Sequence, residues 1–220
     1  MKLVLFDLDH TLLAGDSDVL WCDFLLARGE LDRAAFEARN AEVERGYRDG
    51  SIAPSAFCAF YLSTLAGRSR ASLEPLRRDF MHECILPRIP AAARALVASH
   101  RAAGELLVLS TATNRYLTEL TAADLGFEHV IATEPEEIEG VFSGRFEGTL
   151  NMREGKVLRL REWLAATALP AAMIGGARFY SDSINDLPLL QAVAEPIAVD
   201  PDERLLVHAQ SHGWRVLRLA

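Results

Sequence analysis

Short apolar runs alternate with segments of helical periodicity over most of this chain. The apolar runs lie at residues 2–7, 105–110, 129–132, 177–181, 196–199 and 214–219. Continuous runs of this kind are typical of strands that are buried on both faces of a parallel sheet. Several are separated by segments with helical spacing, at 90–103, 114–125 and 155–167. The alternation predicts an α/β fold with a Rossmann-like, doubly wound parallel sheet.

Residues 14–88 interrupt this alternation. They contain no convincing strand, only amphipathic helical patterns between glycine and proline breaks. We therefore expect an α-helical domain at 14–88, inserted after the first strand. The α/β core domain would then be formed by residues 1–13 and 89–220.

A second irregular segment lies at residues 138–149. Apolar and polar residues alternate there about Ser143-Gly144. Alternation about a short turn sequence predicts a β-hairpin, with the turn at Ser143-Gly144.

Composition limits the class of protein further. Half of the 220 residues are hydrophobic, enough for one large domain or one domain with an insertion. The net charge of -8 argues against nucleic acid or an anionic membrane as a partner, because both require a basic face. Aspartates interrupt the apolar N-terminus, so neither a secretory signal nor a membrane span is expected. Cys22, Cys58 and Cys84 form no CxxC pair, which indicates reduced thiols and a cytoplasmic protein.

The first candidate chemistry follows the first apolar run. Leu3-Val-Leu-Phe leads directly into Asp7 and Asp9, and Thr11 comes two positions later. The carboxyl ends of strands in such sheets open onto the ligand crevice. Two carboxylates this close repel each other unless a cation or a proton lies between them. The alternative is that one aspartate starts a turn or caps a helix.

Three further clusters lie at strand ends or helix starts: Ser110-Thr111, Lys156, and Asp182 with Asn185 and Asp186. Hydroxyl and backbone N–H groups such as those of the first cluster can hold an anion. Taken alone, Ser110-Thr111 is more typical of a helix N-cap and Lys156 of a solvated surface charge, and the two aspartates could be a cap and a solvated residue. Their joint occurrence in one alternating α/β chain favours a shared site.

The order of these four motifs resembles the haloacid dehalogenase-like hydrolase superfamily over nearly the full chain. The insertion at 14–88 resembles the cap domain of its phosphoserine phosphatase-like branch, which also contains histidinol phosphatases. The fourth motif reads Ser-Asp182-Ser-Ile-Asn185-Asp186, where that branch usually has Gly-Asp-Gly-x-Asn-Asp. Both carboxylates are kept, and the resemblance implies a phosphoric monoester hydrolase.

The resemblance also implies roles for the matched residues. Asp7 would be the nucleophile that forms an aspartyl-phosphate intermediate. Asp9 would protonate the leaving alkoxide and later deprotonate the attacking water. Lys156, oriented by Asp186, would balance the negative charge of the intermediate.

The remaining implied roles concern the metal and the phosphate. A Mg²⁺ ion would be held by the Asp7 carboxylate, the backbone carbonyl of Asp9, and Asp182. The Ser110 hydroxyl and the Thr111 amide would bind phosphoryl oxygens, and Asn185 would support this contact. His10, beside Asp9, would lie at the mouth of the site.

Two positions in the insertion bear on the substrate. Asp16 takes the place of an acidic residue that binds the substrate amine in phosphoserine phosphatases, although it is equally suited to cap the helix that follows. Tyr61 stands where those enzymes carry an arginine for the substrate carboxylate. A buried carboxylate without a partner is costly. We therefore expect a small amino-alcohol phosphate such as histidinol phosphate.

Several alternatives stay open at this point. The imidazole of such a substrate could stack on Trp21, Phe57, Phe60 or Tyr61, but Phe57 and Phe60 also suit the core of the insertion. Arg68 or Arg70 could replace the missing arginine and restore phosphoserine binding. The same intermediate could pass its phosphate to an acceptor alcohol, which would make the protein a phosphotransferase. The expected partner is a small phosphorylated metabolite, and the chain would be a monomer or a homodimer.

Overall fold

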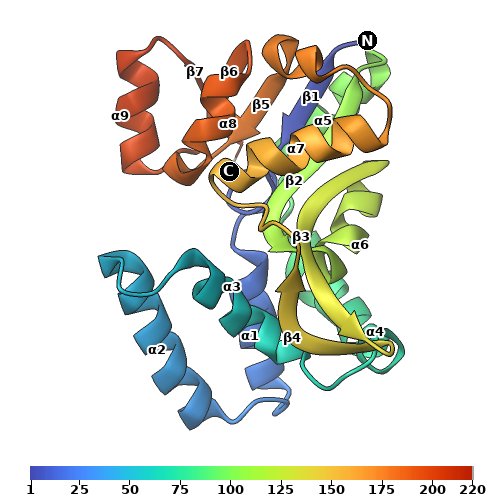
Figure 1. Ribbon diagram of the computed structural model, residues 1–220, viewed down its shortest axis with the longest axis vertical. Helices are drawn as coiled ribbons and strands as arrows, with labels where there is room; N and C mark the ends of the chain where they lie inside the picture. The colour runs from blue at the N-terminus through green and yellow to red at the C-terminus, as the bar shows by residue number, and fades with distance from the viewer. Residues whose placement is uncertain (220) are drawn as a thin grey trace.

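The computed structural model describes residues 1–219, the side chain of residue 48 excepted. Its centre is a seven-stranded sheet in the order β4-β3-β2-β1-β5-β6-β7 (Figure 1). All neighbouring strands are parallel except β3 and β4. The strands are β1 (Leu3–Phe6), β2 (Leu106–Asn114), β3 (His129–Ile138), β4 (Val141–Glu147), β5 (Arg178–Ser181), β6 (Glu195–Val199) and β7 (Arg215–Leu217). The predicted α/β fold with a doubly wound sheet is confirmed.

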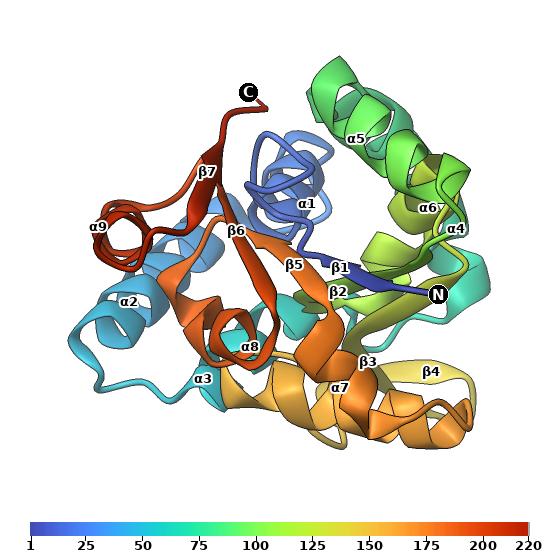
Figure 2. The same cartoon turned by 90° about the horizontal axis from the view of Figure 1, so that it is seen from above.

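Helices cover both faces of the sheet (Figure 2). Alternate residues of β1 point to opposite faces, so Val4 and Phe6 join one apolar cluster while Leu3 and Leu5 join the other. The first cluster includes residues of α5 (Ala91–Ala102) and α6 (Arg115–Leu125). The second includes residues of α7 (Glu154–Ala166), α8 (Leu187–Ala192) and α9 (Glu203–Ser211). None of the helices in the described part of the chain has the length and apolar character that a bilayer crossing requires.

The segment between β1 and α5 is helical. Its elements are α1 (Ser17–Ala27), α2 (Arg33–Asp49), α3 (Pro54–Leu62), η1 (Ser63–Leu65), α4 (Arg70–Phe80), η2 (Met81–Ile85) and η3 (Leu86–Arg88). Local signals set their ends, since Pro54 opens α3 and Gly50 closes α2 with a φ of 81°. Among the described residues of 14–88, the one β contact is an isolated bridge between Ser69 and Val141.

The first apolar cluster continues from the sheet into this helical segment. It joins Phe6 of β1 to Trp21 and Phe24 of α1 and to Leu73 and Phe80 of α4. α1 and α4 therefore pack on the same core as the sheet. The division into a core of 1–13 and 89–220 and a domain of 14–88 stays a prediction.

The hairpin is present, but the predicted turn at Ser143-Gly144 is wrong. Ile138 pairs with Val141, so the two-residue turn is Glu139-Gly140, with φ values of 52° and 78°. Two positive φ values give a turn whose twist matches that of the flanking strands. Gly144 lies inside β4 with a φ of 82°, within the stretch where the ladder shifts register: Pro135 pairs with Phe146, but Glu137 pairs with Phe142. The glycine at position 144 therefore marks this irregularity of the strand and not the turn of the hairpin.

The turn geometry generates a stability prediction. Glu139 occupies a left-handed conformation that asparagine adopts more readily. Glu139→Asn is expected to raise the free energy of unfolding by about 0.5 kcal/mol, or Tm by about 1–2 °C. Thermal unfolding followed by circular dichroism measures the change. Glu147→Asn, exposed on the same hairpin without a positive φ, is the control, and an equal gain there would contradict the explanation.

Candidate active site

The predicted residues meet at the carboxyl end of β1. The chain passes from β1 to β2 on one side of the sheet and later to β5 on the other, so this end is a topological switch point. A cavity of about 240 Å³ opens here between the sheet and the helices of 14–88. Its lining includes most of the predicted residues: Asp7, Asp9, His10, Asp16, Tyr61, Lys156, Asp182, Asn185 and Asp186.

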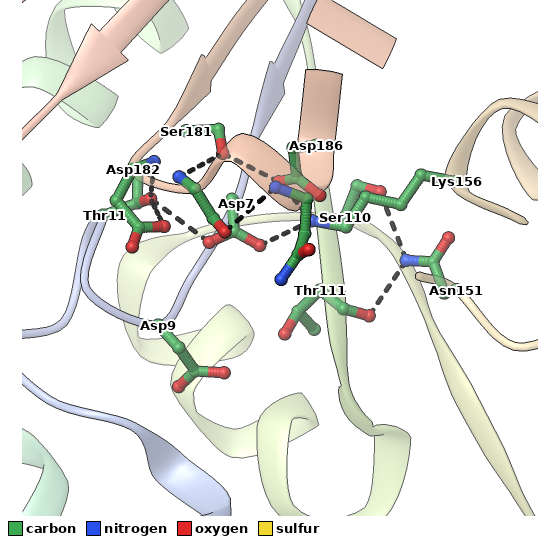
Figure 3. Close-up of polar contacts among 12 residues, drawn as sticks. Asp7, Asp9, Thr11, Ser110, Thr111, Asn151, Lys156, Ser181, Asp182 and Asp186 are labelled. Atoms are coloured by element: carbon green, nitrogen blue, oxygen red, sulfur yellow. Dashed lines mark hydrogen bonds and ion pairs between the residues drawn. The ribbon is translucent and has the colours of Figure 1, made fainter. Parts of the chain in front are cut away.

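Lys156 is held between two carboxylates (Figure 3). Its Nζ donates to Asp7 Oδ1 at 2.7 Å and to Asp186 Oδ2 at 2.6 Å, and Ser181 Oγ donates to the same Asp186 oxygen at 2.7 Å. Its side chain is only 2% exposed. Burial lowers the pKa of Lys156, but the charges of Asp186 and Asp7 outweigh it and raise that pKa overall. Lys156 is therefore a buried, permanent cation beside Asp7.

Thr11 links Asp7 to Asp182. Its Oγ1 lies 3.1 Å from Asp7 Oδ2 and 3.2 Å from Asp182 Oδ1, and it accepts the Asp182 N–H at 3.0 Å. A threonine hydroxyl has one proton, so it can donate to only one of these carboxylates at a time. Burial raises the pKa of Asp7 to about 7, with Lys156 opposing and Asp186 and Asp9 adding. Burial and the charge of Asp7 raise the pKa of Asp182 to about 8.

This pair of carboxylates has the chemistry of a site for a small hard cation. Among the described residues, no three His, Cys, Asp or Glu side chains are grouped as a complete metal cage. Mg²⁺ does not need one, because it keeps several waters and binds through one or two carboxylates plus a substrate phosphate. Asp7 and Asp182 supply that oxygen set, and their mutual repulsion is what a divalent cation would remove. The residues present fit the ion.

Both carboxylate oxygens of Asp9 accept hydrogen bonds. Its Oδ1 accepts the Ser17 N–H at 2.8 Å and the Ser17 hydroxyl, and its Oδ2 accepts the Thr113 hydroxyl at 2.8 Å. Burial and then the charge of Asp16 raise the pKa of Asp9 to about 6, against the effect of these hydrogen bonds. A carboxyl with this pKa can hold or release a proton near neutral pH. Sequence reasoning missed Ser17 and Thr113, although both lie within three residues of a predicted site residue.

The second motif differs from the expectation. β2 continues to Asn114, which is the N-cap of α6 and accepts the Leu117 N–H at 3.1 Å. The alternative in which Ser110 or Thr111 caps that helix is therefore wrong, because asparagine takes the place. Ser110 and Thr111 are fully buried and are not part of the cavity lining, where Ala112 and Thr113 lie. The register of β1 and β2 pairs Phe6 with Leu109, which places Ser110 beside Asp7.

The position of Asp16 is compatible with both of its expected roles, as a helix N-cap and as a residue that binds the substrate amine. Its Oδ1 accepts the Val19 N–H at 3.0 Å as the N-cap of α1, and its side chain also lines the cavity. Tyr61 lines the cavity with Phe57 and Tyr47. Tyr47 and Phe57 are stacked with ring centroids 4.2 Å apart, and Tyr61 meets Phe57 edge-on at 5.1 Å. These rings form an aromatic wall.

Four other residues that the sequence offered lie away from the cavity. Trp21 is buried and donates through Nε1 to Thr64 Oγ1 at 3.1 Å, and Phe60 stacks on Phe36. The alternatives that placed substrate on Trp21 or Phe60 are therefore wrong, since both rings are used in packing.

Arg68 and Arg70 are also engaged elsewhere. Arg68 pairs with Glu30 at 3.0 Å, and Arg70 pairs with Glu137 at 2.7 Å. Neither replaces the arginine that phosphoserine phosphatases carry. Of the described residues that line the cavity, Lys156 is the only lysine or arginine.

Asp18 is the site residue that sequence reasoning missed most clearly. It lines the cavity from the first turn of α1, near Asp9 and Asp16. Thr113 and Asn114 donate to it over long distances of 3.4 Å each. Burial, followed by the charges of Asp16 and Asp9, raises its pKa well above the usual value. The only signal was the pair of aspartates in Asp16-Ser17-Asp18.

Comparisons with known proteins show what the chain as a whole is similar to. A family model described as haloacid dehalogenase-like hydrolase matches residues 4–191. The chain is 40% identical over 217 residues to a histidinol-phosphatase of Neisseria meningitidis serogroup C (strain 8013), which covers 98% of each chain. It is 32% identical over 219 residues to a phosphoserine phosphatase of Mycobacterium tuberculosis, covering 96% of this chain and 68% of the other.

Two solved structures illustrate the structural likeness. A protein of unknown function from Bordetella pertussis Tohama I superposes with a TM-score of 0.95 at 43% identity, covering 100% of this chain and 99% of the other. A substrate-bound phosphoserine phosphatase superposes with a TM-score of 0.69 at 14% identity, covering 100% and 93%. The second likeness concerns the fold alone.

The raised pKa values of Asp7 and Asp182 predict how stability depends on pH. Both exceed the ordinary value of 3.8, so the folded chain binds more protons than the unfolded chain between about pH 4 and 8. Stability must then fall as pH rises through this window. One pKa unit corresponds to about 1.4 kcal/mol, and 1 kcal/mol shifts Tm by roughly 2–4 °C at this size. Without divalent cations, Tm is expected to fall by several degrees between about pH 5.5 and 8.5.

Asp182→Asn should flatten this dependence, because it removes the carboxyl that has the higher of the two raised pKa values. Asp23→Asn, on the exposed face of α1, should retain the wild-type slope. Thermal unfolding in a chelating buffer measures all three proteins. A wild-type Tm that climbs over the same pH range would refute the assignment.

Proposed function

Because the chain belongs to the haloacid dehalogenase-like hydrolases and is a phosphoric monoester hydrolase, we propose that it hydrolyses a small amino-alcohol phosphate such as histidinol phosphate. The observation that carries this proposal is the composition of the part of the cavity wall that residues 14–88 supply. Two carboxylates, Asp16 and Asp18, lie there beside the aromatic wall, and no arginine is among the described lining residues.

This wall suits a substrate that carries nitrogen and lacks a carboxylate. An ammonium group would pair with Asp16 or Asp18 in charge-assisted contacts. A flat imidazole would stack on Tyr47, Phe57 or Tyr61. A substrate carboxylate would be repelled by the two aspartates. The 40% identical relative, a histidinol-phosphatase, supports the same choice.

We infer that Asp7 is the nucleophile. An oxygen–phosphorus bond forms to its carboxylate while the bond from phosphorus to the substrate oxygen breaks. Lys156, fixed 2.7 Å from Asp7, favours the ionised form of the attacking carboxylate and balances the charge of the aspartyl-phosphate. Asp9 gives its proton to the leaving alkoxide and takes one from the water that hydrolyses the intermediate.

The other contacts are proposed from position. Mg²⁺, held by the carboxylates of Asp7 and Asp182 and the carbonyl of Asp9, would supply neutralisation of the phosphate charge. The Ser110 hydroxyl and the Thr111 N–H would bind phosphoryl oxygens, with Asn185 in support. The helical segment 14–88, which supplies Asp16 and Tyr61, would act as the cap domain that selects the substrate.

Phosphoserine is the second candidate, because a 32% identical relative is a phosphoserine phosphatase. Phosphoserine carries a carboxylate where histidinol phosphate carries an imidazolylmethyl group, so the two candidates can be separated kinetically. Adding acceptor alcohols during turnover and analysing the products separates hydrolysis from phosphotransfer.

The substrate proposal predicts a ranking. With Mg²⁺ present, kcat/KM should be highest for histidinol phosphate and at least about tenfold lower for phosphoserine. Asp16→Asn should lower kcat/KM for histidinol phosphate about tenfold, because the charge that pairs with the ammonium is lost. Asparagine is an equally good N-cap, so α1 is preserved. p-Nitrophenyl phosphate has no amine, and its leaving nitrophenolate needs little protonation by Asp9, so it should be hydrolysed within about twofold of wild type.

The control for this series is Asp23→Asn, a neutralisation on the exposed face of the same helix. It should leave all three substrates unchanged. A preference for phosphoserine, or an Asp16→Asn effect of equal size on p-nitrophenyl phosphate, would reject amine recognition at this position.

The nucleophile and metal proposals predict two further losses. Asp7→Asn should lower kcat by about 10³ or more, because an amide cannot form the intermediate. EDTA should abolish activity, and Mg²⁺ should restore it. Mg²⁺ should also raise the Tm of wild type at about pH 8 and raise that of Asp182→Asn much less. Glu162→Gln, exposed on α7, is the matched control, and turnover after complete chelation would refute the metal role.

A further inference from the structure

Asn151 is a buried side chain that no step above uses. It lies in the turn before α7 with 0% of its surface exposed. Its Nδ2 lies 2.8 Å from the Ile131 carbonyl, 2.9 Å from the Thr111 carbonyl and 3.2 Å from Ser110 Oγ. The amide has two protons for these three acceptors, so Ser110 Oγ, at the longest distance, shares a proton with one of the carbonyls. Figure 3 shows the amide nitrogen directed at Ser110 and Thr111.

The orientation of this amide is fixed by its neighbours. The carbonyl oxygens of Thr111 and Ile131 accept only hydrogen-bond donors, so the nitrogen must face them. Asn151 Oδ1 is left buried with no hydrogen-bond partner among the described residues. An unpaired buried acceptor destabilises the folded state. The amide of Asn151 therefore supplies hydrogen-bond donors here, while its unpaired oxygen lowers the stability of the folded state.

The donors act where the ladder between β2 and β3 is interrupted. Ser110 pairs regularly with Ile131, but the next pair is Asn114 with Thr133, and the register shifts between them. Asn151 Nδ2 joins one carbonyl from each strand at this gap. Its own N–H donates to Thr133 Oγ1 at 3.3 Å. Asn151 thus replaces regular strand pairing and fixes the path of β2 beyond Ser110.

The contact also decides what the Ser110 hydroxyl can do. An amide nitrogen donates and does not accept, so the Ser110 proton is not used by Asn151. Among the described residues, Ser110 Oγ makes no hydrogen bond other than the one from Asn151. Since Ser110 lies beside Asp7, its proton is available to a phosphoryl oxygen on Asp7.

We propose that Asn151 is a positioning residue that holds Ser110 with its hydroxyl proton directed at the transferring phosphoryl group. This inference rests on the phosphate-binding role proposed for Ser110. Asn151 touches no reacting atom and acts on the phosphoryl group through the Ser110 hydroxyl.

The turn that carries Asn151 is itself tightly constrained. A Cβ at Gly155 would lie 2.0 Å from the Leu150 carbonyl oxygen, so only glycine allows this approach. Lys156 follows directly. One short turn therefore places Asn151 in the gap between the strands and Lys156 against Asp7.

A double-mutant cycle tests the proposal. Ser110→Ala should lower kcat/KM for p-nitrophenyl phosphate about 100-fold, and Asn151→Ala about tenfold. Asn151→Ala should also raise the inhibition constant of inorganic phosphate about fivefold. In the Ser110→Ala background, Asn151→Ala should change kcat/KM by less than about twofold, because its effect passes through the missing hydroxyl. Asn151→Ser, which keeps a donor in a smaller side chain, should recover part of the loss and serves if Asn151→Ala does not fold.

Thr64→Val is the matched control, since it removes a buried polar group far along the chain from Ser110. It should lower Tm without changing the phosphate inhibition constant. Multiplicative losses in the double variant, or no change in phosphate inhibition for the folded Asn151 variants, would overturn the positioning role. Wild-type activity of Ser110→Ala would instead reject the proposed role of Ser110 and the inference with it.

Discussion

The site depends on the ion pairs that the buried Lys156 ammonium forms with Asp7 and Asp186. An ammonium with 2% exposure is strongly destabilising unless carboxylates surround it, and Asp7 and Asp186 do so at 2.7 and 2.6 Å. These three side chains come from α7, from the end of β1 and from the turn after β5. Each of these segments is therefore held by the same charge balance. Breaking one ion pair would leave a buried charge on the other side, which is why the arrangement tolerates little change.

The cavity is lined by many more carboxyl groups than basic groups. Asp7, Asp9, Asp16, Asp18, Asp182 and Asp186 line it, against the single cation of Lys156 among the described residues. A phosphate ester adds further negative charge, so its binding requires cations that the chain does not supply. A divalent ion bound by Asp7 and Asp182 would offset part of this negative charge. An ammonium group of the substrate, paired with Asp16 or Asp18, would offset another part. The overall net charge of -8 is thus compatible with an anionic substrate.

The sequence predicts the parts of the fold that depend on local pattern. Apolar runs located the parallel strands, and the residues that follow β1 and β5 meet because parallel strands end at one edge of the sheet. What it missed depends on tertiary contact or on the sign of φ. The turn at Glu139-Gly140 is set by two positive φ values, while the more conspicuous Gly144 belongs to a strand irregularity. Asp18 and Asn151 are not part of any of the four sequence motifs. Their places in the site follow only from the packing of α1 and of the turn before α7.

The proposed acid–base residue and the proposed substrate-binding residue are coupled by structure. Ser17, next to Asp16, donates its N–H and its hydroxyl to Asp9, so the start of α1 is tied to that carboxyl. After burial, the charge of Asp16 is the largest cause of the raised pKa of Asp9. An ammonium group paired with Asp16 would offset that charge and lower the pKa of Asp9. Asp9 would then release its proton more readily when a substrate with an amine is bound, which joins recognition at the helical segment to proton transfer at the end of β1.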